Sequence, residues 1–228
     1  MDSQLLTIEP IAIIHNQYTD RFAIPRQSGS TDLLSVVVFL PKYRDENSLR
    51  HIEEFSHLWL IWHFSEIHQE GWSPTVRPPK LGGNKRVGVF ASRSPYRPNA
   101  LGLSHVKLIG VRKTKEDGAV LLVEGGDLMD KTPIFDIKPY LKSDAVQGAK
   151  GGYAVDANTF LKVDFEGQAW ENLSPEERQR LASVLREDPR PGYQNDERRY
   201  AFFFDRYEVF FQIKDGTVYL DEIKNAAD

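Results

Sequence analysis

Residues 75–104 hold the side chains best suited to bind a charged ligand. This block is rich in glycine, proline and arginine, and a short apolar stretch at 87–90 divides it in two. Proline fixes φ and glycine permits close backbone approach, so such loops have a defined shape. Arginines on shaped loops suit a ligand with a carboxylate or a phosphate. The alternative is a structural loop whose arginines bind backbone carbonyl groups, and composition does not separate the two.

The charge distribution also favours a surface for an anionic ligand. Residues 71–115 contain no Asp or Glu but ten Lys and Arg. The formal net charge is −4, so these ten positive charges leave −14 for the rest of the chain. A segregated basic segment can bind an anion even in an acidic protein. A solvated face whose ion-pair partners lie elsewhere in the chain would give the same pattern.

The sequence lacks the residues and motifs that several other kinds of site require. None of the 228 residues is a cysteine, which excludes disulfides, thiolate nucleophiles and cysteine metal sites. His57 and His63 are six residues apart on one face of an apolar stretch, a spacing that suits two metal ligands or two packed imidazoles. Motifs for a zinc-protease helix, a nucleophile elbow, a phosphate loop and a Rossmann site are missing. We therefore predict no metal site.

The elements that must position these residues are mainly β-strands. Runs rich in Val, Ile and aromatic residues, bounded by Gly, Pro, Asn or Asp, predict strands. These runs cover residues 8–14, 34–40, 56–64, 87–90, 103–109, 120–123 and 160–165. An Asp-Gly turn at 117–118 predicts a hairpin between the strand that starts near Ser104 and the strand at 120–123.

Two helices and a final hairpin complete the predicted elements. Apolar residues three apart predict a short helix at 49–55, capped by Ser48. A capping box of Ser174 and Glu177 predicts a second helix that begins at Pro175. The last hairpin is expected to run from 200 to 213, turn at 215–216 and return through 218–223.

The chain divides into two predicted domains. A stretch rich in Gly, Ala and Ser at 143–158 predicts a linker. We expect a mainly β protein, with a β-rich N-terminal domain at 1–145 and a small α+β C-terminal domain at 146–228. The longest apolar runs fall far short of the about 20 residues that span a membrane. The N-terminus lacks the features of a secretion signal, so we expect a cytoplasmic protein with no membrane partner.

The segment RVGVFASRSPYRPNALGLS, residues 86–104, strongly resembles the TsaA/TrmO family of S-adenosylmethionine-dependent tRNA methyltransferases. Similar stretches follow the family's order and cover nearly the whole chain. They are FAIPRQ at 22–27, FSHLW at 55–59, PTVRPPKLGG at 74–83, DIKPY at 136–140 and DPRPGY at 188–193. Many relatives have Pro-Asn-Pro where this chain has Pro98-Asn99-Ala100, a change that relaxes the loop without removing a polar group.

The resemblance implies both a fold and a reaction. The fold is a non-Rossmann β-barrel N-terminal domain that binds S-adenosyl-L-methionine, in a homodimer. The reaction is methylation of N6 of the adenosine at position 37, in the anticodon loop of threonine tRNA. The family acts on this base when it already carries a threonylcarbamoyl group.

The family's cofactor contacts map onto twelve residues of this chain. They are Pro25, Arg26, Gln27, His63, Phe64, Ser65, Arg93, Leu103, Asp127, Leu128, Met129 and Asp130. Arg26 or Arg93 can pair with the methionine carboxylate, and Gln27 can bind the ribose or the adenine edge. Asp127 or Asp130 could bind the ammonium group or the ribose hydroxyls.

Two apolar members of this set have a second interpretation. Leu103 and Phe64 can sandwich an adenine ring, or they can be ordinary core residues. The residue types do not decide between these roles.

The expected reaction sets further requirements. The target nitrogen bears a carbamoyl group and must lose a proton, which suggests a base or a cation near the carbamoyl oxygen. Arg97 and Asn99 are the candidate catalytic residues, and no side chain is a clear general base. The threonyl carboxylate offers a handle for Arg77 or Arg97, which would select the modified base. The residues expected to contact tRNA are Arg77, Lys80, Arg86, Arg190 and Tyr193.

Two alternatives remain open at this point. Arg190 and Tyr193 lie on a proline-stiffened loop suited to phosphate contact and base stacking. Arg190 could instead pair with Glu187, Asp188 or Glu197 and simply hold the domain together. For the whole protein, the other function classes are a non-catalytic tRNA- or nucleotide-binding module and a metal-dependent hydrolase.

Overall fold

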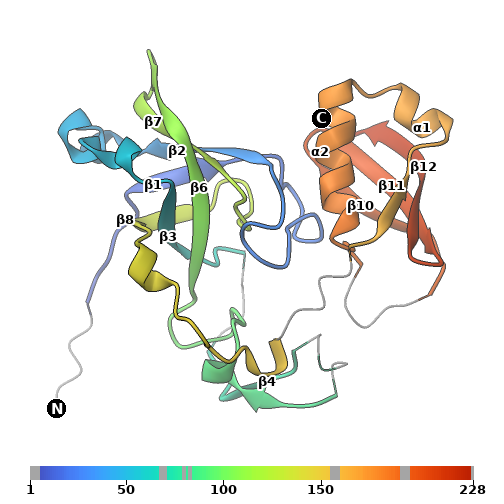
Figure 1. Ribbon diagram of the computed structural model, residues 1–228, viewed down its shortest axis with the longest axis horizontal. Coiled ribbons are helices and arrows are strands. Elements are labelled where there is room, and N and C mark those ends of the chain that lie inside the picture. Colours follow the sequence, from blue (N-terminus) through green and yellow to red (C-terminus); the bar gives the residue numbers. More distant parts are fainter. Residues whose placement is uncertain are drawn as a thin grey trace.

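Six strands close into a barrel that makes up most of the N-terminal half of the chain (Figure 1). The computed structural model describes residues 6–66, 71–78, 81, 84–154, 160–190 and 196–226. The barrel strands are β1 (Ala12–His15), β2 (Leu34–Phe39), β3 (His57–His63), β6 (Leu101–Thr114), β7 (Gly118–Glu124) and β8 (Pro133–Pro139). Their order is β1-β2-β7-β6-β3-β8, and every neighbouring pair is antiparallel. The prediction of a mainly β protein is confirmed.

The barrel core follows from strict alternation along the strands. In β3 the side chains of Leu58, Leu60 and Trp62 are buried, and those between them face outward. Successive side chains of a strand point to opposite faces, so a closed sheet collects every second residue in its interior. The apolar runs at 34–40 and 56–64 therefore contribute alternate residues to the core rather than packing on both faces.

A smaller unit interrupts the barrel between β3 and β6. It contains the paired strands β4 (Thr75–Val76) and β5 (Val87–Gly88), which lie beyond the lower end of the barrel in Figure 1. The predicted strand at 87–90 is thus only two residues long. It stops there because Val89–Ala91 form a 3₁₀ turn, η5, closed by the Ser92 amide donating to the Val89 carbonyl at 3.2 Å.

The C-terminal part is a four-stranded sheet with helices against it (Figure 1). Its strands run in the order β10-β11-β12-β9, and only β12 and β9 are parallel. The elements are β9 (Lys162–Asp164), α1 (Gln168–Glu171), α2 (Pro175–Arg186), β10 (Tyr200–Phe204), β11 (Tyr207–Lys214) and β12 (Thr217–Asn225). Helix α2 buries Leu181, Val184 and Leu185 in the apolar core that it shares with the sheet.

The loop after β1, residues 16–33, ties the two parts together. It places Tyr18, Ala23 and Leu33 in the same apolar cluster as α2 and the C-terminal strands. The Asp205 amide also donates to the Gln17 carbonyl at 2.9 Å. The loop therefore packs into the C-terminal core, whereas the barrel strands enclose a core of their own, and the two parts are not joined by the 143–158 stretch alone.

The helix predicted at 49–55 is wrong. Two 3₁₀ turns lie there, η2 (Glu46–Leu49) and η3 (Ile52–Glu54), after a first one, η1 (Pro41–Tyr43). His51 has φ of 68°, which breaks the helix, and Ser48 caps nothing because the cap is Asp45. The predicted linker also contains 3₁₀ turns, η6 (Lys142–Asp144) and η7 (Gly152–Ala154). None of the described helices is long and apolar enough to cross a membrane.

Two further strand predictions need correction. The strand β8 was not predicted, because its apolar residues are interrupted by Asp136 and Lys138 and it is bounded by prolines. The expected strand from 200 to 213 is two strands, β10 and β11, since Asp205 adopts φ of 54° and reverses the chain.

The capping box of α2 is confirmed and makes stability depend on pH. The Ser174 amide donates to the Glu177 carboxylate at 2.9 Å, and the Glu177 amide donates to the Ser174 hydroxyl at 3.3 Å. The Ser174 amide, and then the Tyr207 hydroxyl at 2.9 Å, lower the pKa of Glu177 to about 2. A carboxylate with a depressed pKa stabilises the fold above its unfolded value and loses this contribution as the pH falls.

We therefore predict that Glu177→Gln flattens the pH dependence of the free energy of unfolding between the ordinary value of 4.5 and about 2. Urea unfolding followed by circular dichroism across this pH range measures the effect. Glu176→Gln, which removes the same charge in the same helical turn, is the control. A wild-type pH profile in the Glu177→Gln variant would contradict the assignment.

Candidate functional site

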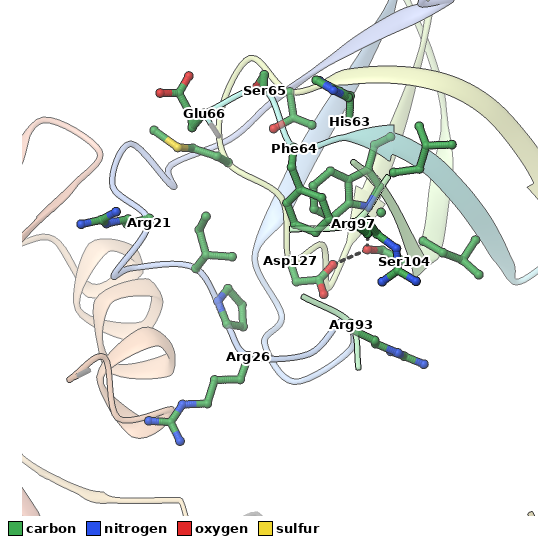
Figure 2. Close-up of a pocket in the computed structure, with 18 of the residues that line it drawn as sticks. Arg21, Arg26, His63, Phe64, Ser65, Glu66, Arg93, Arg97, Ser104 and Asp127 are labelled. Atoms are coloured by element: carbon green, nitrogen blue, oxygen red, sulfur yellow. Dashed lines mark hydrogen bonds between the residues drawn. The ribbon is translucent and has the colours of Figure 1, made fainter. Parts of the chain in front are cut away.

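A cavity of about 600 Å³ opens between the barrel and the loop that joins it to the C-terminal sheet (Figure 2). Four segments supply its walls: residues 21–26, the end of β3 with the residues after it, the loop at 92–97 with the start of β6, and residues 127–132. A volume of this size is typical of a small-molecule site.

A buried chain of hydrogen bonds forms the cavity floor. The Trp62 indole N–H donates to the Ser104 hydroxyl at 2.9 Å, and that hydroxyl donates to Asp127 Oδ1 at 2.5 Å. Burial raises the pKa of Asp127, although the Ser104 hydroxyl acts in the opposite direction. Figure 2 shows this carboxylate at the centre of the site, between Arg26 on the side of the C-terminal domain and Arg93. The cavity floor therefore offers one fixed hydrogen-bond acceptor, the Asp127 carboxylate, whose pKa is raised by burial.

Gly102 lets the indole of Trp62 lie against the next strand. The two residues are directly opposed in the β3–β6 ladder. A Cβ at Gly102 would lie 2.2 Å from Trp62 Cε2, closer than any side chain can approach. Only glycine at this position leaves the Trp62 ring where its N–H reaches Ser104.

The arginines of the cavity have different tasks. Arg97 donates to the carbonyl oxygens of Ser92 and Ser94 at 3.1 and 3.3 Å, so its guanidinium shapes the 92–97 loop. Arg26 donates to the carbonyl oxygen of Asp188 at 3.2 Å, across to the C-terminal domain. Arg93 makes no hydrogen bond or ion pair within the described residues, and it is exposed. Of these three, Arg93 is available to an anionic ligand.

The structure brings most of the predicted cofactor residues into this cavity. The lining includes Pro25, Arg26, His63, Phe64, Ser65, Arg93, Leu103, Asp127 and Met129. It does not include Gln27, Leu128 or Asp130: Leu128 is a fully buried core residue, and Asp130 accepts the Asn16 amide at 3.1 Å. Of the two candidate catalytic residues, Arg97 lines the cavity and Asn99 does not.

A second cavity, of about 670 Å³, lies directly beside the first. Ser92 and Arg93 line both, so the two cavities share a wall. The second cavity also contains Arg77 and Arg86, two of the predicted tRNA contacts. Its remaining residues are Ser73, Thr75, Val76, Pro78, Ser94, Pro95, Tyr96 and Tyr153. Two more of the predicted tRNA contacts, Lys80 and Tyr193, lie outside the described residues.

Several lining residues were not predicted as site residues. Trp62 and Ser104 were read only as parts of strands, and their inward positions follow from the alternation once the barrel is known. Tyr153 lies in the predicted linker, where no sequence signal marks it. Its hydroxyl donates to the Ala91 carbonyl at 2.8 Å, which fixes the start of the 92–97 loop from the linker side.

Two of the six histidines, His57 and His105, belong to an aromatic cluster. His57 lies on the outer face of β3 with Trp59, and both contact His105 and Tyr140 with ring centroids 5.2 to 6.5 Å apart. Burial lowers the pKa of His105, and the nearby His57 adds to this. Within the described residues no three His, Asp or Glu gather as metal ligands would.

Arg190 is held by its own neighbour. Its Nε and Nη2 donate to the two oxygens of Asp188, both at 2.8 Å, and only 9% of its side chain is exposed. Such a two-point ion pair fixes the guanidinium. The geometry supports the interpretation in which Arg190 holds the domain together.

Comparisons with known proteins agree with this architecture. The family model for the tRNA-methyltransferase O N-terminal domain matches residues 13–145, and the model for the TrmO C-terminal domain matches residues 158–226. The chain belongs to the tRNA-methyltransferase O family. The predicted family resemblance is confirmed.

Individual relatives in the family match between 74% and 91% of the chain. The tRNA (adenine(37)-N6)-methyltransferase of Escherichia coli K12 is 37% identical over 220 residues, which are 91% of this chain and 93% of that protein. The enzyme of the same name from Eikenella corrodens is 41% identical over 172 residues, 74% of this chain and 97% of that protein. A crystal structure of TrmO from P. aeruginosa aligns with a TM-score of 0.81 at 28% identity, covering 99% of this chain and all of the other.

We predict that Arg190→Ala lowers the free energy of unfolding by about 1.5–3 kcal/mol, because Asp188 loses a charged partner in a largely buried pair. Denaturant unfolding measures this loss. Arg198→Ala is the matched control, since its side chain is 53% exposed and its ion pair with Asp196 is longer, at 3.4 Å. Unchanged stability together with weaker tRNA binding would show that Arg190 contacts RNA instead.

Proposed function

We propose that this protein is an S-adenosyl-L-methionine-dependent methyltransferase that methylates N6 of the adenine at position 37 of tRNA. One observation carries the proposal: two adjoining cavities share a wall at Ser92 and Arg93. The first has groups that suit the cofactor, and the second is basic and aromatic, as an RNA nucleotide requires. The names of the similar enzymes from E. coli and Eikenella corrodens support the same reaction.

The residues of the first cavity fit S-adenosylmethionine. Asp127 is a partly buried acceptor for the ammonium group or the ribose hydroxyls, and Arg93 is free to pair with the carboxylate. Phe64 and Leu103 line the cavity, where they can enclose the adenine ring. When bound there, the cofactor supplies a methyl group on a positively charged sulfur. We propose that these four residues hold it.

The protein's own contribution is alignment of the reacting groups. Arg97 is engaged with carbonyl groups, so we propose that it positions the 92–97 loop, and with it Arg93, between the two cavities. The Tyr153 hydroxyl holds the same loop from the other side. A wall fixed at both ends keeps the target nitrogen in one orientation, which accounts for a large part of such a reaction's acceleration.

We propose that the specific substrate is threonylcarbamoyladenosine in threonine tRNA. The threonyl group ends in a carboxylate, and the second cavity is lined by Arg77, Arg86 and Arg93, with no Asp or Glu among the described residues of its lining. Arg86 donates to the Thr75 hydroxyl at 2.8 Å, whereas Arg77 makes no hydrogen bond or ion pair within the described residues. We propose that Arg77 takes the carboxylate. The homodimer that the resemblance implies, and the cytoplasmic location expected from the sequence, stay predictions.

The reaction can be tested by nucleoside mass spectrometry. Threonine tRNA bearing the threonylcarbamoyl group is incubated with the protein and methyl-labelled S-adenosylmethionine, then digested. We expect one labelled methyl group on N6 of the modified adenosine. Cofactor binding by calorimetry without any methylated nucleoside would favour the alternative of a non-catalytic nucleotide-binding module.

Selectivity for the acidic group gives a second test. We predict that Arg77→Ala lowers kcat/KM for the threonylcarbamoylated tRNA about 10- to 100-fold, because a charged hydrogen bond worth about 1.5–3 kcal/mol is lost. The variant should change the much lower activity on unmodified tRNA far less. Arg112→Ala, an exposed arginine of β6, is the control for a general loss of positive charge. An equal loss on both tRNAs would assign Arg77 to phosphate contact.

A further inference from the structure

An exposed pair of aromatic side chains stands out from the rest of the surface. Trp72 and Phe90 are 50% and 74% exposed, and their rings are stacked with centroids 6.4 Å apart and planes 27° from parallel. Exposed aromatics packed on each other rather than on the core lose the benefit of burial. Neither residue has a task in the fold or the function described above.

The two residues adjoin, in the chain, segments that line the second cavity. Trp72 precedes Ser73, which lines the cavity, and Phe90 lies two residues before Ser92, in its shared wall. Backbone hydrogen bonds hold both neighbourhoods in place: the Val89 amide donates to the Pro74 carbonyl at 3.0 Å, across the β4–β5 unit. Backbone hydrogen bonds therefore fix the segments that carry the two rings. These segments continue into the lining of the cavity that we assign to the target nucleotide.

The surrounding charge indicates what kind of surface would cover the rings. Residues 71–115 contain no Asp or Glu, and Arg77, Arg86 and Arg93 line the adjacent cavity. A hydrophobic protein segment would gain nothing from these cations. An unpaired RNA strand matches both features, since its phosphates suit the arginines and its bases stack on aromatic rings.

We propose that Trp72 and Phe90 form a stacking platform for a base that neighbours the target adenine in the RNA loop. This proposal rests on the proposed function, because it takes the second cavity as the place of the target nucleotide. The platform holds the neighbouring base outside the loop's own stack, and the target base is thereby free to enter the cavity. The ligand is an unpaired nucleobase of any identity, because every base has a π-face.

The test uses a hairpin RNA with the anticodon loop of threonine tRNA. In two versions of it, 2-aminopurine replaces the base on the 5′ side or on the 3′ side of the target adenine. Stacking on an aromatic ring quenches 2-aminopurine, so we expect the wild-type protein to quench one of the two probes. Trp72→Phe should keep the quenching, because it retains a flat ring. Trp72→Leu and Phe90→Leu, which retain apolar bulk without a π-face, should lose it.

Affinity for the same RNA gives an independent readout. Trp72→Leu should raise the Kd about 5- to 100-fold, the range for loss of one base–aromatic stack. The slope of log Kd against log salt should stay at its wild-type value, whereas Arg77→Ala should make it shallower. Leu34→Ala, another large exposed apolar residue but on β2 of the barrel, is the control and should leave the Kd unchanged.

Three results would overturn the proposal. One is wild-type quenching in both leucine variants, and another is an altered salt slope, which would indicate a charge effect. The third is self-association: if light scattering shows that Trp72→Leu dissociates an oligomer while the RNA affinity is unchanged, the pair is a contact between copies of the chain. Failure of the proposed function looks different, since the wild-type protein would then bind neither RNA probe or would bind tRNA without methylating it. Circular dichroism confirms that each variant is folded.

Discussion

The cavity depends on the hydrogen-bond chain from Trp62 through Ser104 to Asp127. A buried carboxylate is costly unless it is paired, and the only donor that the described structure gives Asp127 from another residue is the Ser104 hydroxyl. That hydroxyl is oriented in turn by the Trp62 indole. Because Gly102 has no Cβ, the Trp62 ring can lie where this bond forms. Trp62 thus belongs both to the barrel core and to the cavity floor, so a change in the packing of one alters the other.

The second constraint is the loop at 16–33, which belongs to two parts of the molecule at once. Tyr18 is buried in the C-terminal cluster, where its hydroxyl bonds to that of Thr31 at 2.8 Å, and burial raises its pKa. A few residues later, Pro25 and Arg26 line the first cavity. Arg26 also reaches the Asp188 carbonyl. One wall of this cavity is therefore set by how the C-terminal sheet packs, although none of the described residues of that domain lines the cavity.

The sequence predicts those features that depend on residues close together in the chain, and it misses those that depend on contacts between distant segments. The Ser174–Glu177 box and the apolar runs at 34–40 and 56–64 are patterns between neighbours in the chain, and α2, β2 and β3 are found where these patterns predict them. The helix at 49–55 failed because apolar residues three apart fit a 3₁₀ turn as well as an α-helix, and Leu49 and Ile52 pack on the barrel from separate turns. Trp62 and Tyr153 enter the site only through strand pairing and a distant loop contact, which no local pattern contains.

The basic stretch at 71–115 shows the same limit at the level of single residues. The sequence left two interpretations of its arginines, binding of an anion or of backbone carbonyl groups. Arg97 follows the second interpretation and binds the Ser92 and Ser94 carbonyls, whereas Arg93, four positions earlier, makes no hydrogen bond or ion pair among the described residues. The first arginine stiffens the loop that presents the second. The loop can hold the Arg93 guanidinium between the two cavities because the hydrogen bonds of Arg97 fix the loop's conformation.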